Sequence, residues 1–415
     1  MGIILEQGKK AKKAADSIAM LTSIEKNELL SAIADQLEKD KELILAENEK
    51  DLQAGYDNGI SKALMDRLRL NEQRIYNMAD GFRHIQSLQD PIGQAIESWT
   101  RPNGIHIQSI RVPLGVVGII YEARPNVTAD AAALCLKTGN AAFLRGSSSA
   151  DFSNKAVVSS IHKVLENHNI PTDAIQLAKD TSREAAAELF TMNDYLDVLI
   201  PRGGAGLIQT VVQQSSVPVL ETGVGNCHVF IDESATKEMG INIALNAKTN
   251  RPSVCNAAET IILHEKWAEQ HGTALIKTLV ENEVEVRGDQ SVQSIHPDVK
   301  AATETDWSEE YLDLTTAVKM VPDINGAIAH IKEYSTGHSE AIITEEESNK
   351  NLFFSNLDAA VLYHNASTRF TDGFEFGFGA EIGVSTQKLH ARGPMGLNAL
   401  TSLKYLVEGS GQIKE

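Results

Sequence analysis

The sequence has few cysteines, no long apolar run and no N-terminal segment typical of secretion. Three cysteines are too few and too scattered for a disulfide framework or a zinc site, so we expect reduced thiols and no metal. The apolar runs are interrupted, as by Gly118, and stay far below the roughly 20 residues that a membrane span needs. An acidic residue comes early and no apolar core follows it, so we expect a cytoplasmic protein without a membrane partner.

Positive charge is also scarce. Acidic side chains outnumber basic ones by 56 to 38, and the formal net charge is −18. A field of this sign repels nucleic acid and anionic lipid, so we expect neither as a partner. An anionic small molecule remains a candidate ligand wherever arginines, lysines or helix N-termini reverse the sign locally.

What the sequence does contain is an ordinary globular composition, 42% hydrophobic over 415 residues, enough for two or three domains. The first 85 residues or so predict helices, with a capping box at Thr22 and Glu25. From about residue 105, short apolar strands alternate with helices, which predicts a parallel, doubly wound sheet. Its expected strands include a half-buried one over 105–112 and another over 217–220. A second α/β unit is expected from about residue 228.

These patterns divide the chain into domains. We expect a doubly wound domain over 1–225 with a return near 360–380, and a second α/β domain over 226–360. The segment after Thr371 is rich in glycine and ends in a predicted strand over 402–407. A terminal strand after a long loop commonly pairs with another chain, so we expect a homo-oligomer. The expected oligomerisation elements are about 126–146 and 383–415.

Cys255 is the strongest candidate for chemistry. It follows a turn at Pro252 and precedes a segment of small residues that could begin a helix. A cysteine at a helix N-terminus, near Arg251 and Lys248, should have a lowered pKa and more thiolate, the nucleophile of acyl chemistry. The alternative is a buried small hydrophobe. Cys135, on an apolar helix, and Cys227, at the start of a strand, are expected to pack in the core.

Two loops at predicted strand ends could bind an anionic ligand. Gly203 and Gly204 lie between a strand and a helix, where the backbone can approach a phosphate and helix N–H groups can donate to it. A tight turn needs glycine in any case. The second loop places Arg145 beside the hydroxyls of Ser147 and Ser148, although serine-rich loops are common without any ligand.

Two polar residues follow apolar strands. Glu221 lies where open α/β sheets place ligands, but a solvated strand end is equally compatible. The amide of Asn126 could donate to a developing oxyanion, or it could serve a turn or helix cap. No Ser/His/Asp order and no metal-ligand spacing stands out.

Six segments in order resemble the aldehyde dehydrogenase superfamily, and within it the reductases that act on an acyl phosphate, γ-glutamyl phosphate. The resemblance runs nearly end to end and implies an aldehyde dehydrogenase-like fold, with the first domain binding the cofactor and the second carrying catalysis. The segments are Val112–Thr128, Lys137–Gly146, Pro201–Gly204, Glu221–His228, Thr249–Ala257 and Phe376–Ser385.

The resemblance implies a catalytic set. In the superfamily the base glutamate precedes the nucleophilic cysteine by 34 positions, as Glu221 precedes Cys255. Cys255 is then the nucleophile, Glu221 occupies the base position and Asn126 resembles the oxyanion-hole asparagine. Arg124 and Arg251 are candidates to bind the phosphate or the carboxylate of the substrate, with an ion pair inside the fold as the alternative for each.

The resemblance also implies a nicotinamide cofactor. Arg145 takes the place of a lysine near the adenine ribose, and Ser148 stands where NAD-preferring relatives carry an acidic residue, so NADPH is expected. Glu310 resembles the glutamate that holds the nicotinamide ribose. The other expected cofactor-binding residues are Ser147, Gly203 and Gly204.

The implied reaction is the NADPH-dependent reduction of L-glutamyl 5-phosphate to glutamate 5-semialdehyde, the second step of proline biosynthesis, with release of phosphate through a Cys255 thioester. An association with glutamate 5-kinase, which would supply the labile acyl phosphate, stays open. Two other functions stay open as well. One is an aldehyde dehydrogenase that oxidises aldehydes with water, which Glu221 would support, and the other is a non-catalytic binding protein on the same scaffold.

Overall fold

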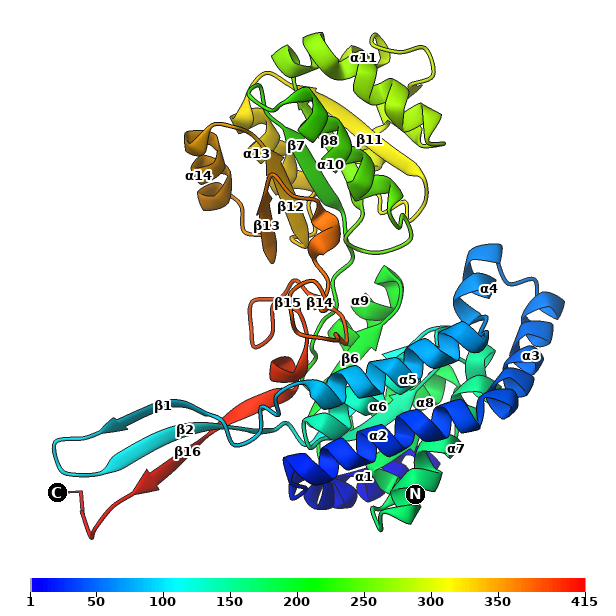
Figure 1. The fold of residues 1–415 in the computed structure, drawn as a ribbon, viewed down its shortest axis with the longest axis vertical. Helices are drawn as coiled ribbons and strands as arrows, with labels where there is room; N and C mark the ends of the chain where they lie inside the picture. The colour runs from blue at the N-terminus through cyan, green and yellow to red at the C-terminus, as the bar shows by residue number, and fades with distance from the viewer. Residues whose placement is uncertain (1, 415) are drawn as a thin grey trace. The chain divides into compact units, whose positions relative to one another are not determined.

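The computed structural model describes residues 2–414, and of Lys62 and Ala63 it describes the backbone only. The chain divides into two compact units (Figure 1). Unit 1 contains the chain up to Glu221, Gly377–Gly383 and the chain from Met395 onward, and unit 2 contains Thr222–Phe376 and Val384–Pro394. Unit 2 therefore extends beyond residue 360, because strand β13 (Val361–His364) pairs with β12 (Ser339–Ile343) in its sheet.

Helices form the first part of unit 1, as the sequence predicts. Thr22 begins α2 with the expected capping box: its Oγ1 accepts from Glu25 N at 3.3 Å, and Glu25 Oε2 accepts from Thr22 N at 2.8 Å. The helices of unit 1 are α1 (Ile3–Ala19), α2 (Ser23–Lys39), α3 (Lys41–Asp57), α4 (Lys62–Leu68), α5 (Glu72–Ser87), α6 (Pro125–Lys137), α7 (Asp151–Asn167), α8 (Arg183–Leu189) and α9 (Ala205–Gln214).

A parallel four-stranded sheet forms the centre of unit 1, in the order β5-β4-β3-β6. The expected strand over 217–220 is reduced to one bridge between Leu199 and Val219, because Pro218 has no N–H with which to extend a ladder. The strands are β3 (Val116–Tyr121), β4 (Ala141–Arg145), β5 (Ile175–Leu177) and β6 (Val198–Arg202).

Unit 1 also carries an antiparallel sheet in the order β1-β2-β16, which Figure 1 shows as a long arm. The expected half-buried strand is β2 (His106–Pro113), but only Ser109 of it is buried, so the prediction of one buried face is wrong. The arm is thin and its faces are not covered by helices. The predicted C-terminal strand is β16 (Thr401–Glu408), and it pairs with β2 of its own chain; the third strand is β1 (Ala95–Thr100).

The segment 126–146, which the sequence predicts to be an oligomerisation element, lies in unit 1. This segment forms most of α6 and all of β4, and both are interior: 11 of the 13 residues of α6 are buried, as are the first four residues of β4. Such a segment has little surface to offer a second chain. Oligomerisation through 383–415, which includes the exposed strand β16, stays a prediction.

Unit 2 is built on a parallel seven-stranded sheet in the order β10-β9-β11-β8-β7-β12-β13. Alternate residues of the central strands face two apolar clusters, with Ile261 packed on the side of α10 and α11, and Ile262 on the side of α13 and α14 (Figure 1). The remaining strands and helices of unit 2 are β7 (Cys227–Ile231), α10 (Lys237–Thr249), β8 (Ala258–His264), α11 (Glu265–Glu281), β9 (Glu285–Gly288), α12 (Gln290–Gln293), β10 (Lys300–Ala301), β11 (Thr315–Val321), α13 (Ile324–Tyr334), α14 (Glu347–Asn356), β14 (Val384–Ser385) and β15 (Gly393–Pro394).

Membrane insertion through a helix is not supported by this architecture. Across residues 2–414, none of the helices combines the length and the apolar character that a bilayer span requires.

Two of the buried histidines of unit 2, His330 and His338, have a lowered pKa. His330 packs edge-on against Trp307, with ring centres 5.4 Å apart, and burial lowers its pKa to about 3. Burial also lowers the pKa of His338 to about 4. Both side chains are therefore neutral at pH 7, and protonation of either opposes folding.

We expect acid to destabilise the protein through these histidines. Both have a lower pKa in the folded chain than the ordinary 6.5, so their contribution is complete above pH 6.5 and is lost as the pH falls. The loss approaches about 1.4 kcal/mol per pH unit for each histidine. Urea unfolding at pH 7.5, 6 and 5 measures it. His330→Phe should reduce the slope by about one proton, whereas substitution of the exposed His168 by Gln should leave it unchanged; equal slopes for wild type and His330→Phe would contradict the assignment.

Candidate active site

Cys255 lies in the turn between α10 and β8. The segment after it is a strand, so the expected helix is wrong, and with it the helix dipole as a source of thiolate stabilisation. Cys255 is partly exposed, whereas Cys135 and Cys227 are buried, as predicted. Burial raises the pKa of Cys135 to about 12 and that of Cys227 well above its usual value. Of the three cysteines, only Cys255 is not buried.

The sequence predicts that Lys248 lowers the pKa of the Cys255 thiol, but its ammonium group is paired with a carboxylate. Its side chain is fully buried in an ion pair with Glu259, so its charge is already neutralised. Burial lowers the pKa of Lys248 and raises that of Glu259 to about 7, while their mutual attraction acts in the opposite direction on both. Lys248 lies in the last turn of α10, and Glu259 is the second residue of β8. The pair therefore closes the base of the loop that carries Cys255.

Gly225 connects Cys255 to Glu310. A Cβ at Gly225 would lie 1.4 Å from the carbonyl oxygen of Cys255, so only glycine fits there. The N–H of Gly225 donates to Glu310 Oε1 at 2.7 Å, and Cys227 Sγ donates to Cys255 O at 3.2 Å. The structure thus brings two residues selected from the sequence, Cys255 and Glu310, into one neighbourhood of unit 2.

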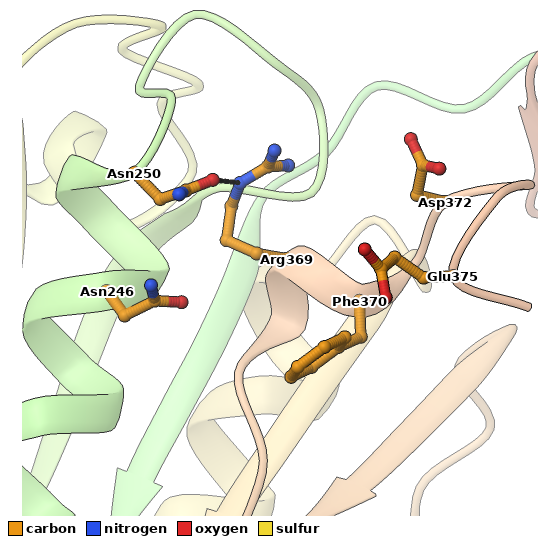
Figure 2. Close-up of a pocket in the computed structure, with 6 residues that line it drawn as sticks. All are labelled: Asn246, Asn250, Arg369, Phe370, Asp372 and Glu375. Atoms are coloured by element: carbon orange, nitrogen blue, oxygen red, sulfur yellow. Dashed lines mark hydrogen bonds between the residues drawn. The ribbon is translucent and has the colours of Figure 1, made fainter.

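Arg369 is part of the same neighbourhood and was not predicted from the sequence. It lies in the 3-10 helix Thr368–Phe370, and its Nε donates to Asn250 Oδ1 at 3.1 Å (Figure 2). Burial lowers the pKa of Arg369, and the nearby Arg251 lowers it further. Arg251, a predicted substrate-binding residue, is exposed. Nothing in the Thr-Arg-Phe sequence around Arg369 distinguishes it from an ordinary loop.

Asn256 bonds the turn of Cys255 to the segment that carries Arg369. Its side-chain Nδ2 donates to Thr371 O at 2.8 Å, and its backbone carbonyl oxygen accepts from Thr368 Oγ1 at 2.7 Å. Asn256 follows Cys255 directly, so these hydrogen bonds join the turn of Cys255 to the backbone on either side of Arg369.

The predicted cofactor residues Arg145, Ser147 and Ser148 meet at the end of β4 in unit 1. Arg145 Nη2 donates to Thr181 O at 2.6 Å and to Ser182 O at 3.1 Å. Burial lowers its pKa, and its Nε has no hydrogen-bond partner among the described residues. Ser147 caps the short 3-10 helix that follows, and Ser148 is exposed.

Gly203 and Gly204 follow β6 and differ in their surroundings. A Cβ at Gly203 would meet Glu122 at 2.7 Å and Leu207 at 2.9 Å, so any larger residue would have to displace these two side chains. Gly204 is open, with nothing within 4 Å of a Cβ, and its N–H donates to Glu122 Oε2 at 3.2 Å. A carboxylate therefore already lies at the N-terminus of α9, where the sequence suggested a phosphate.

The remaining predicted residues are also in unit 1. Asn126 is in the first turn of α6, exposed, and its Nδ2 donates to Asp130 Oδ2 at 3.2 Å. It is not the helix cap, because that position belongs to Arg124. Arg124 is partly buried there, and Glu221, the last residue before unit 2 begins, is partly buried as well.

Comparisons with known proteins agree with this picture. The aldehyde dehydrogenase family model matches residues 5–301. The gamma-glutamyl phosphate reductases of Bacillus cereus and Halalkalibacterium halodurans are 60% identical over 415 and 416 residues, with both chains covered completely. The crystal structure of the gamma-glutamyl phosphate reductase of Thermotoga maritima is 47% identical and superposes with a TM-score of 0.97, again over 100% of both chains.

The chain belongs to the aldehyde dehydrogenase family, and it is an oxidoreductase with the α/β fold of that family. The fold class and the resemblance inferred from the six sequence segments are thereby confirmed. Within the family, relatives named gamma-glutamyl phosphate reductase match the chain over its full length, in agreement with the acyl-phosphate resemblance that the sequence indicated.

The buried ion pair behind Cys255 generates a prediction. Glu259→Leu leaves the ammonium of Lys248 buried without a partner and should lower the free energy of unfolding by about 3–5 kcal/mol. The double variant Lys248→Met/Glu259→Leu removes both charges and should recover most of that loss. Urea unfolding of the single and double variants measures the change in the free energy of unfolding. A single variant as stable as wild type would contradict the assignment of a buried ion pair.

Proposed function

We propose that the protein reduces L-glutamyl 5-phosphate to L-glutamate 5-semialdehyde with NADPH and releases phosphate, the second step of proline biosynthesis from glutamate. The observation that carries the proposal is the identity of 60% over the whole chain to gamma-glutamyl phosphate reductases. The partly exposed Cys255, held in a rigid turn, supports a covalent route.

In the proposed mechanism the Cys255 thiolate attacks the acyl carbon of the substrate. The carbon–sulfur bond forms as the bond to the phosphate oxygen breaks, and phosphate leaves with that electron pair. The Asn126 amide and a backbone N–H beside Cys255 stabilise the oxyanion, and the hydrogen bond to Asp130 orients the amide. After reduction of the thioester, cleavage of the carbon–sulfur bond returns the thiolate and leaves the aldehyde.

NADPH, when bound, supplies the hydride for this reduction. Two observations support a fit to the residues of unit 1: the buried Nε of Arg145 lacks a partner among the described residues, and Gly204 leaves open space beside the backbone. Ser147, Ser148 and Gly203 complete the proposed site there, and Glu310, fixed by Gly225, would hold the nicotinamide ribose. Because Ser148 carries no charge, it does not repel a 2′-phosphate.

Glu221 has no water to activate in this reaction, so we assign it a positioning or proton-transfer role. Arg124 and Arg251 remain proposed contacts for the phosphate or the carboxylate of the substrate. We place the reaction in the cytoplasm, where thiols such as the three free cysteines stay reduced. We also propose a homo-oligomer built through β16, whose Leu403, Tyr405 and Val407 are exposed, and an association with glutamate 5-kinase.

The proposed function is tested in the reverse direction, with glutamate 5-semialdehyde, NADP⁺ and inorganic phosphate. Wild type should form NADPH only when phosphate is present, because phosphate must release the acyl group from Cys255. Cys255→Ser should lower kcat by at least about 1,000-fold. The matched control is the buried Cys135→Ala, which should keep its activity. Turnover without phosphate would indicate an aldehyde dehydrogenase that uses water, and full activity of Cys255→Ser would exclude the thioester.

The cofactor preference is tested at Ser148. A carboxylate in the variant Ser148→Glu should repel the 2′-phosphate and raise the KM for NADPH by about tenfold or more, in line with an uncompensated like-charge contact. The KM for NADH should stay the same or fall. Initial rates with both cofactors measure the ratio, with Ser148→Gln as the neutral control of similar size. An unchanged ratio in Ser148→Glu would show that residue 148 does not face the ribose.

A further inference from the structure

A cavity of about 330 Å³ opens in unit 2 beside the turn of Cys255. Its walls come from α10, from the residue that follows α10, and from the segment after β13 (Figure 2). The volume is in the range of small-molecule sites. The lining residues are Asn246, Asn250, Arg369, Phe370, Asp372 and Glu375.

Arg369 is the unusual member of this lining. Its guanidinium has one side-chain acceptor, the neutral amide oxygen of Asn250. Its Nη1 is buried and, within residues 2–414, has no hydrogen-bond partner. None of the ion pairs of the described chain includes Arg369, although the protein is strongly acidic. A guanidinium that is partly removed from water and has no paired anion is destabilised, so the arrangement is suited to an anionic ligand.

Two of the other polar groups of the cavity, Asp372 and Glu375, carry the opposite charge. Asp372 and Glu375 lie on one side of Arg369 in Figure 2, and Asn246 and Asn250 lie on the other. The carboxylate of Asp372 is held by the N–H of Phe374 at 2.8 Å instead of by Arg369. A cation and two carboxylates that are not paired with each other match a ligand that carries both an anion and a cation close together, as an α-amino acid does.

The cavity is adjacent to the nucleophile. Asn256, which follows Cys255, is bonded to the backbone at Thr368 and Thr371, on either side of Arg369. A ligand whose charged end occupies the cavity can therefore extend its side chain toward the thiol.

We propose that this cavity binds the α-amino-acid end of the substrate, with Arg369 receiving the α-carboxylate and Asp372 and Glu375 the α-ammonium group. The proposal rests on the proposed function, since it names the subsite that selects a glutamyl chain over other acyl phosphates. Arg251, exposed and close to Arg369, is then left for the phosphate end.

The first experiment measures binding alone. Isothermal titration of the full chain with L-glutamate, which carries the same charged end and does not react, should show at least about tenfold weaker binding to Arg369→Met, the usual scale for a lost charge-assisted contact. Arg369→Lys should lie between the two. Glutarate, which lacks the amine, should be affected by Arg369→Met but not by Asp372→Asn. The surface variant Lys266→Met controls for the loss of one positive charge and should bind as wild type.

The second experiment measures turnover in the reverse direction. Arg369→Met should raise the KM for glutamate 5-semialdehyde by at least about tenfold and leave the KM for inorganic phosphate unchanged. A raised KM for phosphate instead, or unchanged L-glutamate binding in an Arg369→Met protein that unfolds at the wild-type temperature, would overturn the proposal. If wild type shows no phosphate-dependent turnover, the proposed function fails, while the L-glutamate titration still decides whether the subsite exists.

Discussion

The turn that carries Cys255 is held in place by a buried ion pair and a backbone contact, and the chemistry proposed for Cys255 depends on both. Lys248 and Glu259 close the loop at its base, and Gly225 packs against the Cys255 carbonyl at a distance that excludes any side chain. The proposed nucleophilic catalysis needs a fixed turn because a misplaced sulfur loses most of the advantage of proximity. Glu310 is fixed by the same glycine, so one packing constraint positions both residues.

The three cysteines differ more clearly in their solvent exposure than in their local sequences. Cys135 and Cys227 are surrounded by protein, and desolvation keeps their thiols protonated. Cys255 is partly exposed and interacts electrostatically with the guanidinium group of Arg369. Positive charge near a thiol favours the thiolate, so in the proposed mechanism Arg369 takes the role that the sequence had suggested for Lys248 and a helix N-terminus.

Two partly buried guanidinium groups lie within a strongly acidic protein. With a net charge of −18, the chain as a whole repels phosphates and carboxylates. Arg145 in unit 1 and Arg369 in unit 2 are both partly desolvated, and each keeps a nitrogen without a partner among the described residues. Neither guanidinium forms an ion pair with a carboxylate of the described residues, so each can still pair with the charge of a bound anion.

The sequence alone determined the family, the α/β class and the helical beginning, and it selected Cys255 as the candidate nucleophile, because these depend on local periodicity, caps and motif spacing. Predictions from the sequence were wrong where the structure depends on residues that are distant in the chain. The expected strand over 217–220 forms only one bridge, and the segment after Cys255 is a strand instead of a helix. Lys248 forms an ion pair with Glu259. Only the tertiary structure brought Arg369 next to the turn of Cys255, since hydrogen bonds between segments far apart in the chain leave no periodic signal in either one.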